Sequence, residues 1–378
     1  MPLASVIQVA LDQAVTDGVF PGAVLAVRHR GEQPDIYAAG RISSEQSAQA
    51  VDRRTIYDLA SLTKPLSTVT AIVLLIQEGR CRLHERVDVY LPELTGRPIG
   101  TATLWHLLTH CSGLPGWRGY YERVSQAGVL PASERNRAAA NVSFLEMIGA
   151  EPLIYERGAR SLYSDLGFML LGMVVTRCGA RPLDRVFLER IARAAHAETL
   201  EFVPAEDRQT FLACAADRGI GVAPTEIDSW RGRLLCGEVH DENAASLGGV
   251  AGHAGLFGSV EGVLAVTGAW LQARQHRDSF LDCGLVKEFT ERQRTIPGAS
   301  WALGWDTPSP PSSGGRFISE ASFGHLGYTG TSIWIDPKCE LEMVLLSNRV
   351  HPTRKNERIK TFRPLIHELI YREYQNRS

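Results

Sequence analysis

The sequence predicts an α/β (α+β) fold, in which an antiparallel sheet flanked by helices carries an inserted, mainly helical lobe. Two observations predict it: short apolar strand patterns occur near both ends of the chain, and helical periodicity with long loops fills the middle. The simplest architecture that buries both sets of strands is one sheet built from the two termini. We expect a sheet lobe of residues 1–85 and 295–378, a helical lobe of residues 86–294, and an active site between them.

The N-terminal part predicts a helix, a hairpin and a second helix. Residues 3–16 have helical periodicity, which ends at Gly18. Residues 23–27 and 35–39 have the apolar pattern of two strands joined by a turn. Apolar periodicity then returns from about residue 61 to residue 77, before Gly79, and predicts a helix there.

The same sequence patterns predict helices and strands in the middle and in the C-terminal part of the chain. Helices are expected at residues 104–109, 165–177 and 260–274, each inside the predicted helical lobe. Residues 330–335 and 341–346 predict two strands joined as a hairpin, and residues 354–374 predict an amphipathic helix. The strands at the end of the chain are therefore expected to pair with those at its start.

Composition excludes several classes of function. The 378 residues carry 40 basic and 42 acidic side chains, a net charge of −2, so no basic face for nucleic acid is expected. The longest apolar stretch, residues 166–175, is shorter than the roughly 20 residues of a membrane span. No glycine-rich phosphate loop follows a strand, and His106 and His110 lack a third ligand, so neither a cofactor nor a metal is expected.

The cysteines and the start of the chain bear on the compartment. Seven cysteines are spaced widely and form no C-x-x-C pair, which favours free thiols in a reducing compartment. The first residues lack the basic start and apolar run of a signal peptide. We therefore expect a cytoplasmic protein, although a periplasmic one stays open if a leader was trimmed. The sequence predicts no oligomeric state.

The first chemical motif is Ser61-Leu-Thr-Lys64, followed by Pro65. Residues three apart lie on one face of a helix, so the hydroxyl and the amine can meet there. Proline is tolerated in the first helical turn, which places Ser61 at the helix start, where free N–H groups favour negative charge. A lysine can act as a base if its pKa is lowered, whereas arginine stays protonated. Lys64 is one of only five lysines, although such a pair also arises by chance.

Two further motifs are weak when each is taken alone. Tyr163-Ser164-Asp165 precedes an apolar helix, where a tyrosine beside a lysine would shuttle protons, but Ser164 or Asp165 would equally serve as a helix N-cap. Gly324-His325-Leu-Gly327 precedes the final hairpin, where glycines let the backbone approach a ligand, but a simple turn would look the same.

In this order, the three motifs resemble those of the serine β-lactamase and penicillin-binding-protein superfamily, and most closely its class C β-lactamase-like branch of esterases and peptidases. Three supporting stretches also resemble that branch: residues 107–115, 254–257 and 327–331. The resemblance covers roughly residues 8–372 and implies a β-lactamase/transpeptidase-like fold.

The resemblance also implies roles for individual residues. Ser61 would be the acylated nucleophile, and Lys64 and Tyr163 would share the acid–base work. The backbone N–H groups of Ser61 and Tyr328 would form the oxyanion hole. His325 and Gly327 would line the substrate cleft.

Two departures from the β-lactamase pattern bear on the substrate. His325 stands where β-lactamases usually carry lysine, and a neutral histidine would hold a substrate carboxylate less well. Asp165 replaces an asparagine, which puts an anion where substrate binds. Arg354 would restore some affinity for an anion.

The predicted function is that of a serine hydrolase that forms an acyl-enzyme with an ester or amide. The substrate would be a small molecule or a short peptide. The alternative is a β-lactamase or DD-peptidase acting on β-lactams or D-Ala peptides. A more remote alternative is a catalytically inactive binding protein that retains the fold.

Overall fold

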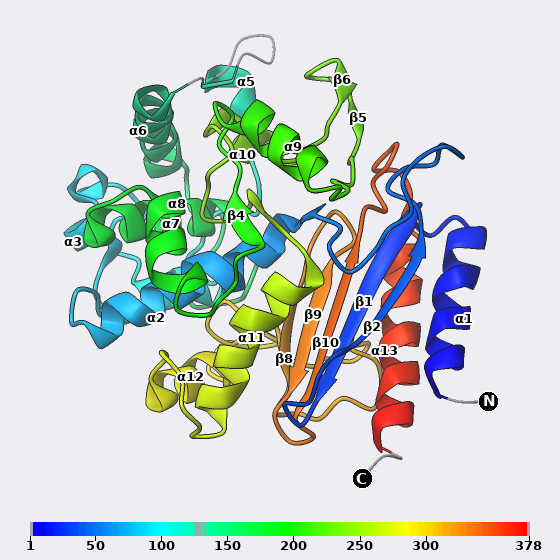
Figure 1. The fold of residues 1–378 in the computed structure, drawn as a ribbon. Coiled ribbons are helices and arrows are strands. Elements are labelled where there is room, and N and C mark those ends of the chain that lie inside the picture. The colour runs from blue at the N-terminus through cyan, green and yellow to red at the C-terminus, as the bar shows by residue number, and fades with distance from the viewer. Residues whose placement is uncertain (1–2, 125–129, 132, 376–378) are drawn as a thin grey trace.

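The computed structural model describes residues 3–124, 130–131 and 133–375, and it contains a five-stranded antiparallel sheet (Figure 1). The strand order is β2-β1-β10-β9-β8. Two strands come from the start of the chain and three from its end: β1 (Gly22–His29), β2 (Asp35–Gly40), β8 (Phe323–Leu326), β9 (Ser332–Asp336) and β10 (Leu341–Ser347). The prediction of a sheet built from both termini is confirmed.

Alternation along the central strands gives the sheet two apolar faces. On β1, Val24 and Ala26 belong to one buried core, and Ala23, Leu25 and Val27 belong to another. The strand register places Leu25 opposite Leu345 of β10, so the two strands direct matching side chains to each face. Because both faces are apolar, each must be covered by helices.

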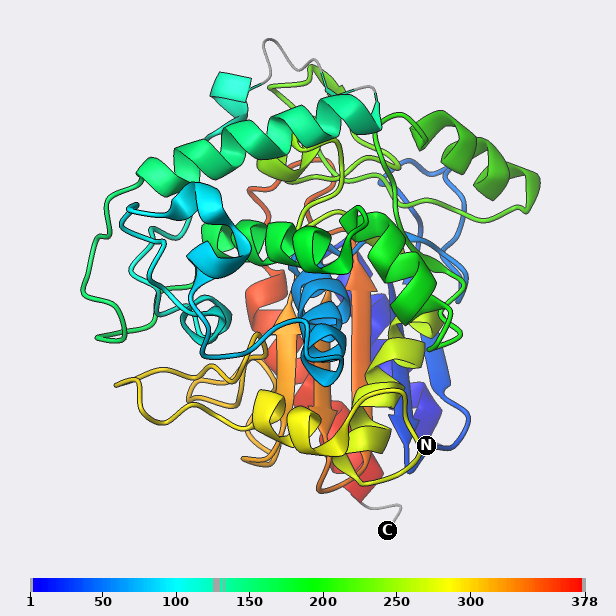
Figure 2. The same cartoon turned by 90° about the vertical axis from the view of Figure 1, so that its left-hand side faces the viewer.

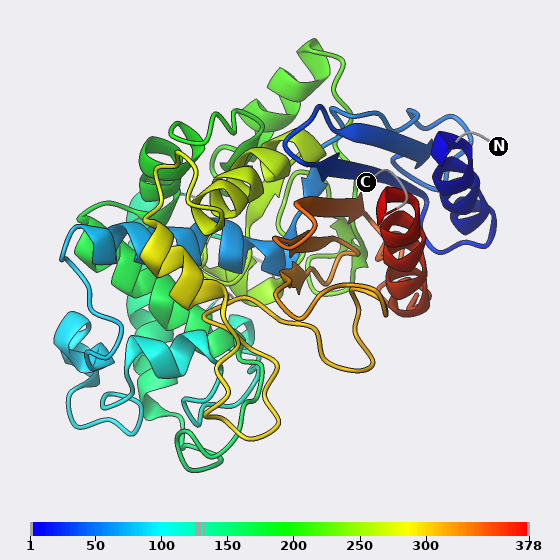
Figure 3. The ribbon, with the colours of Figure 1, turned by 90° about the horizontal axis from the view of Figure 1, so that it is seen from below.

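The two faces have different covers. Helices α1 (Leu3–Thr16) and α13 (Ile359–Gln375) lie side by side on one face, as Figures 1 and 3 show. Helix α11 (Val260–Arg274) packs on β1 and β10 from the opposite side. A buried network ties α11 to the sheet, because Arg28 of β1 donates to Glu342 of β10 and to the Leu264 carbonyl. The sequence placed residues 260–274 in the helical lobe, but α11 directly covers the sheet.

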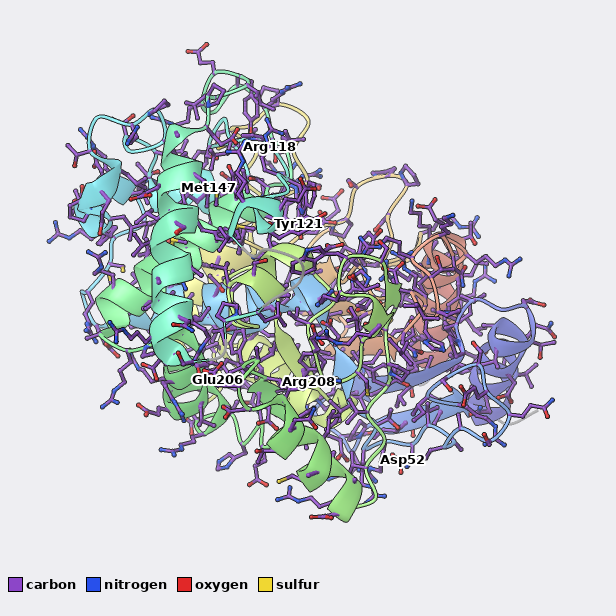
Figure 4. The ribbon with its side chains drawn as sticks, turned by 90° about the horizontal axis from the view of Figure 1, so that it is seen from above. Asp52, Arg118, Tyr121, Met147, Glu206 and Arg208 are labelled. Carbon is purple, nitrogen blue, oxygen red and sulfur yellow. The ribbon has the colours of Figure 1, made fainter. Side chains whose placement is uncertain are left out.

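The remaining elements gather beyond α11, and Figure 2 shows α6 crossing the top of the molecule, with α7 between it and the sheet. Seen from above, Glu206 lies near one end of α6 and Met147 near the other (Figure 4). The bounds of these elements are β3 (Tyr57–Asp58), α2 (Thr70–Gln77), α3 (Val87–Tyr90), α4 (Leu104–Leu108), α5 (Tyr121–Val124), α6 (Glu134–Ala150), α7 (Asp165–Gly179), α8 (Leu183–Phe187), β4 (Leu200–Phe202), α9 (Arg208–Asp217), β5 (Ile227–Asp228), β6 (Arg233–Leu234), α10 (Glu242–Ser246), β7 (Leu256–Gly258) and α12 (Cys283–Thr290).

Two predicted boundaries move in the structure. Helix α13 begins at Ile359 rather than residue 354, because the Arg354 N–H donates to the Glu226 side chain and holds residues 354–358 in a loop. Strand β9 begins at Ser332 rather than residue 330, because Gly330 has a positive φ of 118° in the turn before it.

Within the described residues, two apolar segments have the length or composition of a membrane span. Residues 60–77 form an 18-residue helical segment, but 83% of it is buried inside the protein. Helix α7 and residues 183–192 reach the required length only together, and a bend of 71° separates them. Since these segments pack within the core, burial explains their hydropathy.

Candidate active site

The segment that carries Ser61 is a tight turn between β3 and a helix. Ala60 adopts the left-handed conformation (φ +48°), and its N–H donates to the Asp58 carboxylate over 2.8 Å. A 3₁₀ turn at Ala60–Leu62 and a π-helical segment at Lys64–Val69 then lead into α2. This geometry places Ser61 in the first turn of the helix, as its sequence context predicts.

Lys64 lies directly beneath Ser61 and is fully buried. Its Nζ lies 2.9 Å from Ser61 Oγ, 2.7 Å from Asp165 Oδ1 and 3.2 Å from the His253 carbonyl oxygen. The residue pair predicted from the Ser-x-x-Lys spacing is therefore in contact, and Asp165 reaches Lys64 from the first residue of the distant helix α7.

The protonation state of Lys64 differs from the sequence expectation. Burial lowers the pKa of Lys64, but the negative charge of Asp165 and interactions with Tyr163 outweigh burial, so the pKa of Lys64 is raised above its ordinary value. The sequence argument required a lowered pKa for a base. Asp165 has the opposite effect on the pKa, because its carboxylate stabilises the ammonium form of Lys64 in the resting site.

Tyr163 immediately precedes α7 and faces the lysine. Lys64 Nζ lies 4.8 Å from the centre of the Tyr163 ring. Burial raises the pKa of Tyr163 and outweighs the lowering effects of Lys64 and of a hydrogen bond to Ser61. The N-cap reading of this motif is confirmed, since the Ser164 hydroxyl accepts from the Gly167 N–H. Its two neighbours, Tyr163 and Asp165, face Lys64, and a proton-shuttle role for Tyr163 stays a prediction.

Aromatic side chains hold Tyr163 in place. The ring of His110 lies 4.7 Å from the Tyr163 ring, and the ring of Trp301 lies 5.4 Å from it, measured between centroids. The Ser164 N–H donates to His110 Nδ1 over 3.0 Å. Sequence reasoning weighed His110 only as a metal ligand and missed Trp301. His110 and Trp301 pack on Tyr163 from segments far apart in the chain, so no local sequence pattern could have identified these contacts.

The third motif is tied to the nucleophile turn by hydrogen bonds. Thr329 Oγ1 donates to the Asp58 carbonyl and Thr331 Oγ1 to the Leu59 carbonyl. Gly327 is required here, because a Cβ would lie 2.7 Å from the Leu59 carbonyl oxygen. Tyr328 is thereby held beside the turn that carries Ser61.

His325 is a neutral side chain in this site. Its pKa is lowered to about 3, first by burial and then by the charge of Lys64. Its Nδ1 lies 2.9 Å from the Leu326 carbonyl oxygen. The expectation that a histidine here carries no positive charge thus has a physical basis in burial and in the neighbouring ammonium.

Arg354 is near the site, but its charge is compensated. The guanidinium pairs with Glu226 and with Glu242, the latter over 2.7 Å. The predicted anion affinity is therefore reduced, since two carboxylates already balance one cation. Sequence reasoning missed both partners, because they lie more than 100 residues away.

A cavity of about 580 Å³ joins these side chains. Lys64 does not line it, but reaches it from below through Ser61. Every other predicted site residue lines it: Ser61, Tyr163, Asp165, His325, Gly327, Tyr328 and Arg354. Residues that the sequence did not single out also line it, among them Trp117, His240, His253, Trp301 and Asp306.

Comparison with known proteins places this site in context. Residues 7–367 match the family model described as Beta-lactamase. An N-acetylmuramyl-L-alanine amidase of Bacillus subtilis (strain 168) is 31% identical over 354 residues, covering 88% of this chain and 78% of the relative. A putative D-alanyl-D-alanine carboxypeptidase of Escherichia coli (strain K12) is 31% identical over 325 residues, covering 82% and 73%.

Solved structures share the whole fold at lower identity. EstCE1, a hydrolase with promiscuous acyltransferase activity, superposes with a TM-score of 0.72 at 19% identity and covers 98% of both chains. Unliganded simvastatin synthase (LovD) from Aspergillus terreus superposes with a TM-score of 0.73 at 21% identity and covers 100% of both chains. These two likenesses support the β-lactamase/transpeptidase-like fold.

Proposed function

Because the chain belongs to the beta-lactamase family and is a serine hydrolase, we propose that it cleaves an ester or amide through an acyl-enzyme on Ser61. The observation that carries the proposal is the contact of Lys64 Nζ with Ser61 Oγ at 2.9 Å, at the floor of an open cavity. A serine becomes a nucleophile only with such a partner within hydrogen-bond distance. The intact set also argues against an inactive binding protein.

The reaction would proceed in two steps. The pair first loses one proton, because a charged Lys64 beside a neutral Tyr163 cannot accept another. Ser61 Oγ then attacks the substrate carbonyl carbon, and its proton passes to the Lys64–Tyr163 pair, which donates it to the leaving group as the bond to that group breaks. Water then attacks the acyl-enzyme, and the same pair takes a proton from that water and donates it to Ser61 Oγ as the bond between Ser61 and the acyl group breaks. The two side chains act as one unit, because each shifts the pKa of the other.

Backbone donors would stabilise the oxyanion of each tetrahedral intermediate. Ser61 N–H lies in the first turn of the helix, and Tyr328 N–H belongs to the segment that Thr329 and Thr331 tie to the same turn. One donor of this kind typically contributes about 2.7–4 kcal/mol to the transition state. The hydroxyls of Thr329 and Thr331 would thus help to position the oxyanion hole without serving as its donors.

The relatives favour an amide substrate, but the branch also contains esterases. The two relatives described above are an amidase and a putative carboxypeptidase, and enzymes of both kinds cleave amide bonds. We propose a small-molecule or short-peptide substrate on that basis. A β-lactamase or DD-peptidase activity is the second candidate, and the carboxypeptidase relative favours it.

A parallel substrate screen separates these candidates. It would compare a short-chain nitrophenyl ester, a chromogenic cephalosporin, D-amino-acid amides and an N-acetylmuramyl-L-alanine conjugate, each against wild type and Ser61→Ala. Rapid ester or amide cleavage with an inert cephalosporin supports the first candidate. Rapid cephalosporin cleavage supports the second, and activity that survives in Ser61→Ala overturns the nucleophile.

We also propose a cytoplasmic location on the cysteines alone. All seven cysteines are free thiols in the structure, and a reducing compartment keeps thiols free. Fractionation of the native host with an antibody to the chain tests this location.

A further inference from the structure

One carboxylate in the active-site cavity has no counter-charge. Five carboxylates line the cavity, and four of them lie within 4.0 Å of a nitrogen of a basic side chain: Asp165 of Lys64, Asp241 of His253, Glu242 of Arg354, and Glu357 of Lys360. Asp306 is the fifth, and among the described residues no cationic group lies within 4.0 Å of it. Its Oδ1 accepts hydrogen bonds from Ser300 Oγ over 2.6 Å and from the Thr307 N–H over 3.0 Å. Within the described part of the chain, its Oδ2 has no such donor.

The pKa of Asp306 reflects this missing charge. Burial raises the pKa to about 6, and the bonds from Ser300 and Thr307 together with the distant charge of Arg292 only partly offset it. Arg292 itself donates to the Ala299 and Pro308 carbonyls. A largely buried carboxylate without a counter-charge is costly, and a cation that binds the cavity would reduce that cost.

A second side chain that lines the same cavity, that of His325, also accepts hydrogen bonds. Asp306 pairs with Gly324 through two backbone hydrogen bonds, directly before His325 in the chain. His325 Nδ1 faces the Leu326 carbonyl, which can only accept, so Nδ1 carries the proton of the neutral ring. His325 Nε2 is then a lone pair, and it is buried without a partner among the described residues.

The aromatic ring of Trp301 also lines the cavity near these two residues. Trp301 is bridged to Asp306 through the backbone, and its ring lies 5.7 Å from the His325 ring. Aromatic faces attract cations, and both polar groups here are acceptors. The cationic side chains that line the cavity are already engaged with carboxylates or carbonyls: Arg349, Arg354, Lys360 and Arg363.

We propose that Asp306, His325 and Trp301 form a subsite for a protonated primary amine of the substrate. An ammonium has three N–H donors, and Asp306 Oδ2 and His325 Nε2 are both acceptors without a donor among the described residues. A carboxylate would be repelled there by the charge of Asp306 and would find no donor on Asp306 Oδ2 or His325 Nε2. This inference rests on the proposed function, since it describes which substrates enter the same cavity, and it adds their charge.

The test compares three head groups on one scaffold: 2-phenylethylammonium, 3-phenylpropionamide and 3-phenylpropionate. Each is measured as a competitive inhibitor of short-chain nitrophenyl ester hydrolysis and, by calorimetry, as a ligand of Ser61→Ala, which needs no turnover. We expect the ammonium to bind at least about tenfold more tightly than the carboxylate, as a charged hydrogen bond predicts. Asp306→Asn should weaken the ammonium by about tenfold and leave the neutral amide unchanged.

The matched control is Asp278→Asn, which removes the same charge from an exposed position. It should keep the ammonium preference, and loss of the preference there would overturn the subsite in favour of overall charge. Carboxylate bound as tightly as ammonium, or an ammonium unaffected by Asp306→Asn, would also overturn the subsite. Hydrolysis that persists in Ser61→Ala would overturn the proposed function instead, while the calorimetric result would still decide the subsite.

Discussion

Lys64 Nζ lies 2.7 Å from Asp165 Oδ1, so the lysine next to the nucleophile is held in its charged form by a carboxylate. The β-lactamase pattern has an uncharged asparagine at this position. In this chain, the resting site therefore combines a raised pKa of Lys64 with a neutral Tyr163, and proton transfer from Ser61 must overcome the ion pair.

Asp165→Asn should lower the pKa of Lys64, because it removes the main influence that raises this pKa and leaves burial in place. If the deprotonated Lys64–Tyr163 pair is the active form, the acid limb of the kcat/KM profile moves to lower pH and the rate at pH 7 rises. Profiles of wild type and variant with one neutral ester check this, with Asp278→Asn as control. An acid limb that stays in place, or moves to higher pH, would contradict the role of the ion pair.

Lys64→Arg should reduce kcat/KM by about 10²–10⁴-fold, although it keeps the positive charge. Arginine stays protonated and cannot exchange a proton with Ser61. Circular dichroism and thermal unfolding would show whether the variant is folded. Near-wild-type turnover by the folded variant would refute an acid–base role for Lys64.

Asp58→Ala should lower kcat while KM for a neutral ester changes little. Its carboxylate accepts from the Ala60 N–H over 2.8 Å and from the His240 N–H over 2.7 Å, so it positions the turn that carries Ser61 without reaching the substrate. Each unpaired buried N–H would cost about 1–3 kcal/mol of stability. Asp58→Asn, which keeps one acceptor, should restore part of kcat, and a change confined to KM would contradict a positioning role.

Stability should fall as the pH drops below about 6.5. Burial lowers the pKa of His106 and of His367 to about 4. Between these values and the ordinary histidine pKa, the unfolded chain binds more protons than the folded one, so the free energy of unfolding decreases with decreasing pH.

His367→Gln isolates one of these contributions, because His367 is fully buried between the Ser313 carbonyl and Ser332. The slope of unfolding free energy against pH, from urea titrations between about pH 4.5 and 6.5, should be smaller by up to about 1.4 kcal/mol per pH unit. His196→Gln, at an exposed position, should leave the slope unchanged. Equal slopes in wild type and His367→Gln would contradict the linkage.

The sequence predicts most helices and strands because periodicity is local. Residues 3–16 and 260–274 match α1 and α11 in full, because the helix-forming residues and the ends of each segment are visible in the local sequence. Periodicity did not show that α11 covers the sheet, because the Arg28–Glu342 pair that holds it joins residues 314 positions apart.

The functional site likewise has some features that the sequence predicts and others that it does not. The contact of Ser61 with Lys64 follows from helical spacing, and the structure contains it. The charge state of Lys64 depends on Asp165, 101 residues away, and the role of Asp306 depends on the absence of a nearby cation among the described residues. Burial and neighbouring charges in the folded chain determine such effects, and a sequence pattern does not show them.

The central claim is that Ser61 becomes acylated during turnover, and intact mass spectrometry tests it most directly. The enzyme would be mixed with a short-chain nitrophenyl ester, quenched in acid at early times, and digested to locate the added mass. The account predicts one acyl group on the peptide that contains Ser61, formed and lost at rates consistent with kcat, and no adduct or turnover in Ser61→Ala. Undiminished turnover by Ser61→Ala, or an acyl group on another residue that forms and decays at those rates, would contradict it.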